Sequence, residues 1–212
     1  MKDSEEITKA AMIANMKDGV YIKRGEHLYD YASAEKLKDL EEWDGHDAHV
    51  VVVCPNLVFM IDGKDLDVHP FSLSLESNDS GHFLDIYEAT HMTDADAYEE
   101  TELLAEAGSP AALAVKRQGE VCFLPSVGHL IAIQHFRKQI NQAIDTFCFD
   151  DPIILSWYWS CCQEDASIAW HISMDYGIIY YYIKTLTYRV RAISAIDLNS
   201  LTLHLSNYTT EE

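Results

Sequence analysis

The alternation of side chains in residues 153–193 constrains the fold of this chain more than any other feature. In residues 170–174, apolar and polar side chains alternate: Trp170, Ile172 and Met174 are apolar, and His171 and Ser173 between them are polar. A period of two is typical of a half-buried β-strand. Residues 178–183 and 188–193 continue the pattern, and Gly177 predicts a turn because glycine tolerates positive φ. The stretch therefore predicts a meander of short strands, with one face in the core and the other in solvent.

Three consecutive tyrosines occupy positions 180–182 of this stretch. Tyr181 is predicted to face the core, where β propensity alone accounts for a tyrosine. Tyr180 and Tyr182 are predicted to face solvent, on the same side as His171 and Ser173. Exposed aromatic rings among small polar side chains are typical of a recognition surface, because tyrosine gives a large, rigid contact area at low entropic cost.

Three helices have clear sequence signals. The strongest is predicted at 126–144, where Ser126 is a suitable N-cap and apolar residues recur every three or four positions. A second helix is predicted at 93–106. A third, short helix is predicted at 109–116, where Pro110 suits the first helical turn.

Weaker signals divide the rest of the chain. Helices are predicted at 5–16 and 33–42, the second with Ser33 as N-cap. Strands are predicted at 19–23, 50–53, 57–61, 72–75, 121–124 and 198–205. The pair Asp62-Gly63 predicts a turn, and the remainder of 64–92 is predicted to be loop.

Acidic residues dominate the charge of the chain. There are 35 acids against 15 lysines and arginines, a formal net charge of −20. A nucleic-acid binder must neutralise phosphates, so nucleic acid is not expected as a partner. Anionic membrane surfaces are disfavoured for the same reason. Six acids of the helix at 93–106 are interpreted as a solvated face, with a basic partner as the alternative: Asp94, Asp96, Glu99, Glu100, Glu102 and Glu106.

Neither a secretory signal nor a membrane span is predicted, because the first residues are charged and the longest apolar run is short. Free thiols are therefore expected at the five cysteines, as in a reducing cytosol: Cys54, Cys122, Cys148, Cys161 and Cys162. The histidine pairs have no third ligand at metal-binding spacing, and the chain has no Gly-rich phosphate loop and no Gly-x-Ser-x-Gly elbow. We expect no metal, no cofactor and no catalytic residue.

Short motifs, in their order along the chain, resemble those of C-type-lectin-fold proteins. The carboxy-terminal motifs are W-Y-W-S at 157–160, A-W at 169–170, Gly177 before a tyrosine-rich strand, and Y-R-V-R-A at 188–192. The amino-terminal motifs are G-V-Y-I-K-R at 19–24, E-E-W-D-G at 41–45 and F-L-P-S at 123–126. More narrowly, the pattern is similar to the variable proteins that retroelements diversify in bacteria and in phages of gut Bacteroidales.

This resemblance implies an α+β, C-type lectin-like fold with a C-terminal β-meander and two or more flanking helices. Residues 121–212 would form the ligand-display region. Residues 1–120 would attach or support it, or pack with it into one domain. The implied function is non-catalytic recognition of a receptor, as a phage tail receptor-binding component whose surface residues are diversified by a retroelement.

The resemblance also implies which positions vary. Variable codons in such proteins descend from asparagine-type codons with mutated adenines. The residues that fit this rule are Cys162, Ser167, Ile168, His171, Ser173, Tyr176, Ile178, Tyr180, Tyr182, Thr185, Leu186 and Thr187. Glu164 lies at a varying position but breaks the codon rule, and these thirteen residues are the predicted ligand-binding set. Trp159, Trp170 and Lys184 do not fit the rule.

Two further expectations come from the same resemblance. Arg189 and Arg191 are implied to be structural, with guanidinium groups that bond loop carbonyls. Calcium-dependent sugar binding is not expected, because Cys54-Pro55-Asn56 lacks the carboxylate of the sugar-binding loop and Trp170 is followed by histidine.

The implied partners are a protein or glycan receptor on a host cell and, through the N-terminal region, other tail or surface-assembly proteins. Homo-oligomerisation is left open. The implied location is the virion, after synthesis in the cytoplasm without a signal peptide. Two alternatives also stay open. A bacterial surface or pilus-like adhesin would use the same face after an unknown export route, and an enzyme of the formylglycine-generating type would need Cys161 or Cys162 to be reactive.

Overall fold

The computed structural model describes residues 16–40, 47–74, 80–148, 150–197 and 200–204. These residues form an α+β fold in which ten strands share one sheet. The strands are β1 (Gly19–Arg24), β2 (His27–Asp30), β3 (Ala48–Cys54), β4 (Leu57–Pro70), β5 (Cys122–Phe123), β6 (Trp157–Gln163), β7 (Ile168–Ser173), β8 (Ile179–Ile183), β9 (Thr187–Ala195) and β10 (Thr202–His204). Their order is β10-β2-β1-β3-β4-β9-β6-β7-β8, with β5 paired to β9.

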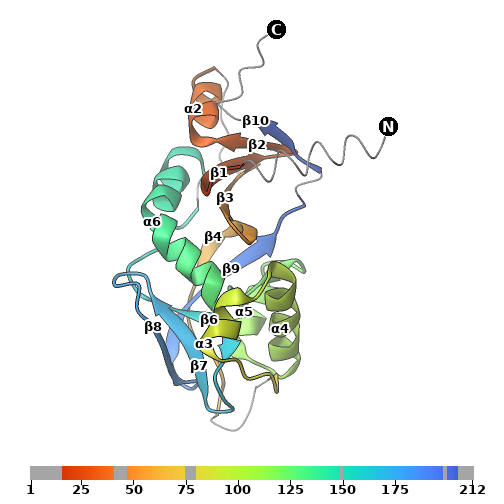
Figure 1. Ribbon diagram of the computed structural model, residues 1–212, viewed down its shortest axis with the longest axis vertical. Helices are drawn as coiled ribbons and strands as arrows, with labels where there is room; N and C mark the ends of the chain where they lie inside the picture. Colours follow the sequence, from red (N-terminus) through yellow and green to blue (C-terminus); the bar gives the residue numbers. More distant parts are fainter. Residues whose placement is uncertain (1–15, 41–46, 75–79, 149, 198–199, 205–212) are drawn as a thin grey trace.

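Helix α6 (Val127–Phe147) packs across this sheet and touches β1, β3, β6 and β7. Ser126 caps it as predicted, and the helix continues three residues beyond the predicted end. The other described helices are α2 (Tyr31–Leu40), α3 (Ile86–His91), α4 (Asp94–Glu106) and α5 (Pro110–Lys116). Figure 1 shows α3, α4 and α5 beside the lower half of α6, with β8 near one end of the molecule and β10 near the other.

The core joins strands from both halves of the sequence. Val50 and Val52 of β3 belong to the main cluster together with Trp159 of β6, whereas Val51 and Val53 face a smaller cluster on the other side of the sheet. A strand buried on both faces needs a continuous apolar run, which explains the four consecutive valines. The N-terminal strands β1, β3 and β4 and the C-terminal strands β6, β7 and β9 thus share one sheet and one main core.

The C-terminal strands do not form the predicted simple meander. Strands β6, β7 and β8 are consecutive antiparallel neighbours, but β9 does not pair with β8. Instead β9 lies between β4 and β6, antiparallel to the first and parallel to the second. This insertion leaves β8 at the edge of the sheet.

The prediction of a turn at Asp62-Gly63 is wrong. Strand β4 runs through this pair to Pro70, because it forms a long ladder with β9. The register shifts twice, between Ile61 and Asp65 and between Asp65 and Val68, and Asp67 adopts a φ of 68°. These irregularities let the strand continue through residues that normally favour a turn.

Most other predicted elements are present with shifted ends. The predicted strand at 72–75 is absent over 72–74, and α3 was missed because its six residues are too few for a periodic signal. Helix α2 begins before Ser33, whose backbone N–H donates to Asp30 Oδ1 (2.8 Å), so Ser33 is not the N-cap. Residue 75, residues 5–15 of the helix predicted at 5–16, the end of the one at 33–42 and part of the strand at 198–205 lie outside the described residues.

Gly128 of α6 packs against the backbone of α3, so Gly128→Ala is expected to destabilise the fold. A Cβ at this position would lie 2.4 Å from the carbonyl oxygen of Thr90. The overlap should cost about 1–3 kcal/mol, more than the roughly 1 kcal/mol by which alanine favours a helix. Urea unfolding should show a lower midpoint. Gly119→Ala is the control, since its Cβ would meet only Cys122 Sγ at 3.5 Å; a variant at 128 as stable as this control would contradict the close packing.

Candidate recognition surface

Strands β6, β7 and β8 place one row of side chains across a single face of the sheet. Trp159 pairs with His171, and His171 pairs with Tyr180. Side chains that are directly opposite in antiparallel strands lie on the same face. We call this side, which also carries Ile178 and Tyr182, the display face.

A buried aromatic layer underlies the display face. The His171 side chain is enclosed by rings, with centroids 4.6 Å away at Tyr188, 4.7 Å at Trp157 and 5.4 Å at Trp159. Trp159 is itself fixed, because its Nε1 donates to the carbonyl oxygen of His69 (3.0 Å). Tyr180 sits on this layer, 6.2 Å from the His171 ring. The exposed ring of Tyr180 therefore packs on a buried aromatic layer that hydrogen bonding holds in place.

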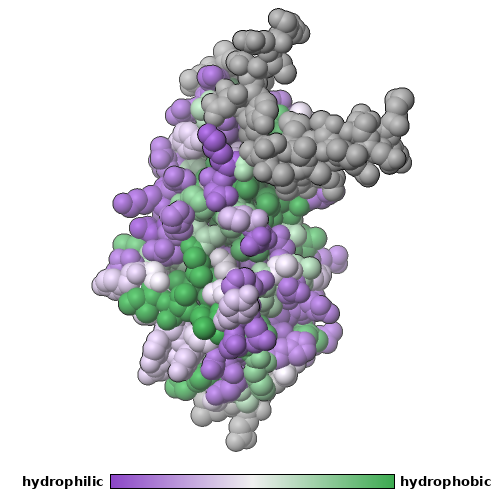
Figure 2. All heavy atoms as spheres, in the orientation of Figure 1, coloured by the Kyte–Doolittle hydropathy of each residue, from purple (hydrophilic) through white to green (hydrophobic). Residues whose placement is uncertain are grey.

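Six residues of the predicted ligand-binding set are exposed. Tyr176 is 74% exposed, Tyr180 51% and Tyr182 44%, and Ile178 and Leu186 are exposed as well. Thr187 is also exposed, and the remaining accessible members are half-buried: Glu164, Ser167, Ile168 and Thr185. Figure 2 shows hydrophobic side chains at the surface where α6 and β8 lie in Figure 1.

The prediction that Cys162, His171 and Ser173 are exposed is wrong. His171 is only 2% exposed because the aromatic layer covers it, and Ser173 is buried while its Oγ accepts the backbone N–H of Tyr176 (3.2 Å). Cys162 lies in the core, with its Sγ 3.3 Å from Met92 Sδ. His171 and Ser173 thus support the surface and do not form it.

Tyr181 lies on the core-facing side of the sheet, directly opposite Trp170, but it is not buried as predicted. Its side chain is 40% exposed and meets the Trp170 ring edge-to-face at 5.0 Å. The cause is the position of β8 at the sheet edge, where Tyr181 has a neighbouring strand on one side only. Trp170, on the neighbouring strand, is buried, and its Nε1 donates to the carbonyl oxygen of Leu84 (3.0 Å).

A buried polar cluster holds the turn after β8, and no local sequence pattern indicates it. Lys184 Nζ donates to Gln163 Oε1 (2.6 Å) and to the carbonyl oxygen of Ala166 (2.9 Å). Gln163 Nε2 in turn donates to Ser80 Oγ (2.6 Å) and to Glu100 Oε1 (3.2 Å). Glu100 is buried, so its assignment to a solvated acidic face is wrong. Thr185 and Leu186 are therefore carried by an anchored turn.

The two arginines of β9 tie neighbouring segments together. Arg191 is buried and its Nη1 donates to the carbonyl oxygen of Asp151 (2.9 Å), the structural role that was predicted. Arg189 instead bonds a carboxylate, since its Nη1 lies 2.9 Å from Asp65 Oδ1. Asp65 also accepts a hydrogen bond from the Tyr158 hydroxyl (3.0 Å). These contacts join the irregular part of β4 to β6 and β9.

The described residues give little support to metal or thiol chemistry. They contain no group of three or more His, Cys, Asp or Glu side chains arranged to hold a metal ion. All five cysteines are free, as expected. The Sγ atoms of Cys161 and Cys162 are 3.8 Å apart in the core, and burial raises the pKa of the Cys161 thiol. A raised pKa lowers the thiolate fraction, the opposite of what a reactive cysteine requires.

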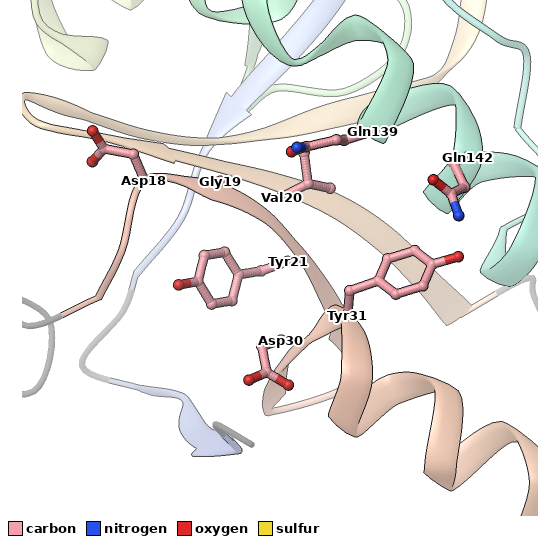
Figure 3. Close-up of a pocket in the computed structure, with 8 residues that line it drawn as sticks. All are labelled: Asp18, Gly19, Val20, Tyr21, Asp30, Tyr31, Gln139 and Gln142. Atoms are coloured by element: carbon pink, nitrogen blue, oxygen red, sulfur yellow. The ribbon is translucent and has the colours of Figure 1, made fainter. Parts of the chain in front are cut away.

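A separate pocket of about 340 Å³ lies between β1, the start of α2 and α6 (Figure 3). Asp18, Tyr21 and Asp30 line one side, and Gln139 and Gln142 of α6 line the other. Two carboxylates, two amides and the side chains of Tyr21 and Tyr31 therefore line the pocket.

Comparisons with known proteins do not identify the chain. No model of a protein family matches it, and no curated protein is significantly similar.

Burial of His171 generates a prediction for stability against pH. Burial lowers its pKa from 6.5 to about 4, so the folded protein favours the neutral ring. The contribution of the neutral His171 ring to the free energy of unfolding is therefore complete above pH 6.5. It is lost as the pH falls towards 4, because the unfolded chain then binds the proton more tightly than the folded chain does. Between pH 7.5 and 5.2 the wild type should lose about 1.5 kcal/mol more unfolding free energy than His171→Phe.

Urea unfolding at several pH values measures this difference. Carboxylates titrate in both proteins, so their effect cancels in the comparison. His135→Phe is the control, because it removes an imidazole that is exposed on α6 instead of a buried one. Parallel stability curves for wild type and His171→Phe would show that folding does not lower the pKa of the His171 imidazole.

Proposed function

We propose that the display face is a non-catalytic recognition surface for a protein or glycan receptor on a host cell. The observation that carries the proposal is the exposure of Tyr176, Tyr180 and Tyr182 above a fixed aromatic layer. Tyrosine contributes contact area and a hydroxyl group while losing few rotamers on binding. Packing on a fixed aromatic layer further reduces the side-chain entropy that is lost on binding.

The fold is proposed to be C-type lectin-like, and the chain a retroelement-diversified variable protein on a phage tail. Support comes from the order of elements, in which the long helix α6 precedes W-Y-W-S and strands β6, β7 and β8. Further support comes from the α+β fold, in which one sheet joins strands from both ends of the chain. The bond from Arg191 to a loop carbonyl agrees with the role that the resemblance implies.

The division between exposed and buried positions supports a variable surface on a constant base. Trp159, Trp170 and Lys184, which the codon rule excludes, are buried and hydrogen-bonded. Side chains such as Tyr180 and Tyr182 can change without disturbing that base, since outward positions of a strand do not touch the core. His171 and Ser173 are exceptions, because substitutions there would alter the supporting layer.

Attachment is proposed for the end of the molecule that carries β10, β2 and α2. Figure 1 places this end opposite β8, so a carrier bound there would leave the display face free. No described helix has the length and apolarity needed to cross a membrane.

The enzyme alternative is less well supported than recognition. It requires Cys161 or Cys162 to reach a substrate, and both side chains are fully buried. An adhesin would use the same display face and differs only in what carries it.

Replacing both Tyr180 and Tyr182 with alanine should weaken receptor binding at least tenfold and leave the melting temperature nearly unchanged. The half-exposed rings supply contact area, and surface substitutions usually alter stability by about 0.5 kcal/mol or less. Fluorescently labelled protein can be titrated against a panel of fixed gut Bacteroidales cells and a glycan array. Tyr87→Ala is a matched control, because Tyr87 is an exposed aromatic residue on α3. Equal binding by the double variant and the wild type would refute the assignment of the surface.

The retroelement origin has its own test in the neighbouring DNA. A template repeat matching codons 157–191, with adenines at the variable positions, and a nearby reverse-transcriptase gene are expected. Sequencing the locus and comparing copies should show substitutions at the codons for exposed residues such as Tyr176 and Ile178. A locus without a template repeat would contradict diversification and leave receptor binding to be judged separately.

A further inference from the structure

Strand β8 is an edge strand without the usual protection against pairing. The register with β7 directs Tyr180 and Tyr182 to one face and Tyr181 and Ile183 to the other, all four side chains are exposed, and the adjacent rings of Tyr180 and Tyr181 stack with centroids 5.3 Å apart. Proteins normally shield such edges with charges, prolines or bulges. Residues 177–183 contain neither a charge nor a proline, and the register with β7 is continuous over five pairs. The next charged side chain, Lys184, is buried and points away from the edge.

The hydrogen bonds to β7 show which backbone groups of β8 face outward. Ser173 N–H donates to the Ile178 carbonyl, and Lys184 N–H donates to the Ser167 carbonyl, both at 3.0 Å. In an antiparallel pair, alternate residues bond to the same neighbour. The even-numbered residues of β8 therefore face β7, and the N–H and C=O groups of Ile179, Tyr181 and Ile183 point to the open edge. The Ile183 carbonyl already accepts the N–H of Leu186 (3.2 Å).

We propose that β8 pairs with β8 of a second copy of this chain, antiparallel about a two-fold axis at Tyr181. The strand reads I-Y-Y-Y-I, the same in both directions. A two-fold interface must be self-complementary, and this palindrome satisfies the requirement. Tyr181 would lie opposite Tyr181 of the partner subunit, and Ile179 opposite Ile183 of the partner subunit.

The backbone supports the same register as the side chains. Centring the pair on Tyr181 matches outward-facing residues with outward-facing residues at 179, 181 and 183, so their N–H and C=O groups meet, and the Ile183 carbonyl accepts a second hydrogen bond beside that from Leu186. Tyr180 and Tyr182 then form non-hydrogen-bonded cross-strand pairs on the display face. Each aromatic cross-strand pair contributes roughly 0.2–1 kcal/mol. A second copy fits better than an unrelated extended peptide. With a second copy, the one register centred on Tyr181 aligns the outward-facing N–H and C=O groups and also places tyrosine opposite tyrosine and isoleucine opposite isoleucine.

The pairing rests on the fold and does not require the proposed function. If both hold, the dimer joins two display faces into one surface, and two receptor contacts can act together. The net charge of −20 on each copy opposes association, while the strand itself is uncharged. Salt screens the long-range repulsion, so added salt should strengthen the dimer.

Sedimentation equilibrium of the full chain without any ligand tests the dimer. We expect a monomer–dimer equilibrium whose association is stronger in 500 mM than in 50 mM NaCl. Tyr181→Lys should weaken association at least tenfold, because the two lysines would meet at the two-fold axis. Val121→Lys is the matched control, with the same change of charge at a side chain that is 65% exposed and far along the chain. Thermal melts should show both variants folded. A monomer at every concentration, or equal association of Tyr181→Lys and Val121→Lys, would overturn the proposal.

Engineered disulfides test the register. Hydrogen-bonded antiparallel residues have Cα atoms about 5.5 Å apart, within disulfide range. Tyr181→Cys should therefore form a covalent dimer on oxidation beyond any background from the native thiols. Ile179→Cys should not, because the symmetric residue lies four positions along the partner strand, about 13 Å away. Crosslinking by Ile179→Cys in preference to Tyr181→Cys would overturn the two-fold at Tyr181.

Discussion

The insertion of β9 between β4 and β6 is the constraint on which the rest of the structure depends. Its ladder with β4 joins the N-terminal strands to the display strands, and its parallel contact with β6 places Tyr158 beside Arg189. The same insertion brings the Tyr188 ring against His171, completing the buried aromatic layer. It also removes β9 from β8, which leaves the tyrosine-rich strand at the edge.

This arrangement places the charged side chains of Arg191 and Lys184 inside the protein, and each makes hydrogen bonds there. Buried charges are costly unless hydrogen-bonded or opposed by other charges. Arg191 bonds a carbonyl and is surrounded by the negative fields of Asp65, Asp150 and Asp62. Lys184 has an amide and a carbonyl as acceptors. Such contacts are directional, so they fix the position of turns that apolar packing alone would leave less defined.

The sequence predicted the elements that local rules determine. Helices α4, α5 and α6 have capping side chains at Thr93, Ser109 and Ser126, and their periodicity made them recognisable. The alternation in β7 likewise marked a strand. These features depend on neighbours within a few residues, which is why one sequence sufficed.

The misplaced features depend on partners distant in the sequence. Whether β9 pairs with β8 or with β4 cannot be read from alternation, because both choices satisfy it. The exposure of Tyr181 and the burial of His171 follow from that pairing and were therefore predicted wrongly. Glu100 looked like one of several solvated acids, and only the contact with Gln163, 63 positions away, reveals its buried role.

Strand β8 has to tolerate changes in its surface side chains while the fold stays the same. Its position at the edge of the sheet allows both. Only one side of its backbone is bonded to β7, and its side chains contribute little to the main core. Substitutions at Tyr180 or Tyr182 therefore alter the surface at small cost in stability. An edge that tolerates change also remains open to pairing, so the property that permits variation is the one that permits self-association. Changes at Tyr181 would then be restricted by the two-fold contact, while the display-face tyrosines stay free to vary.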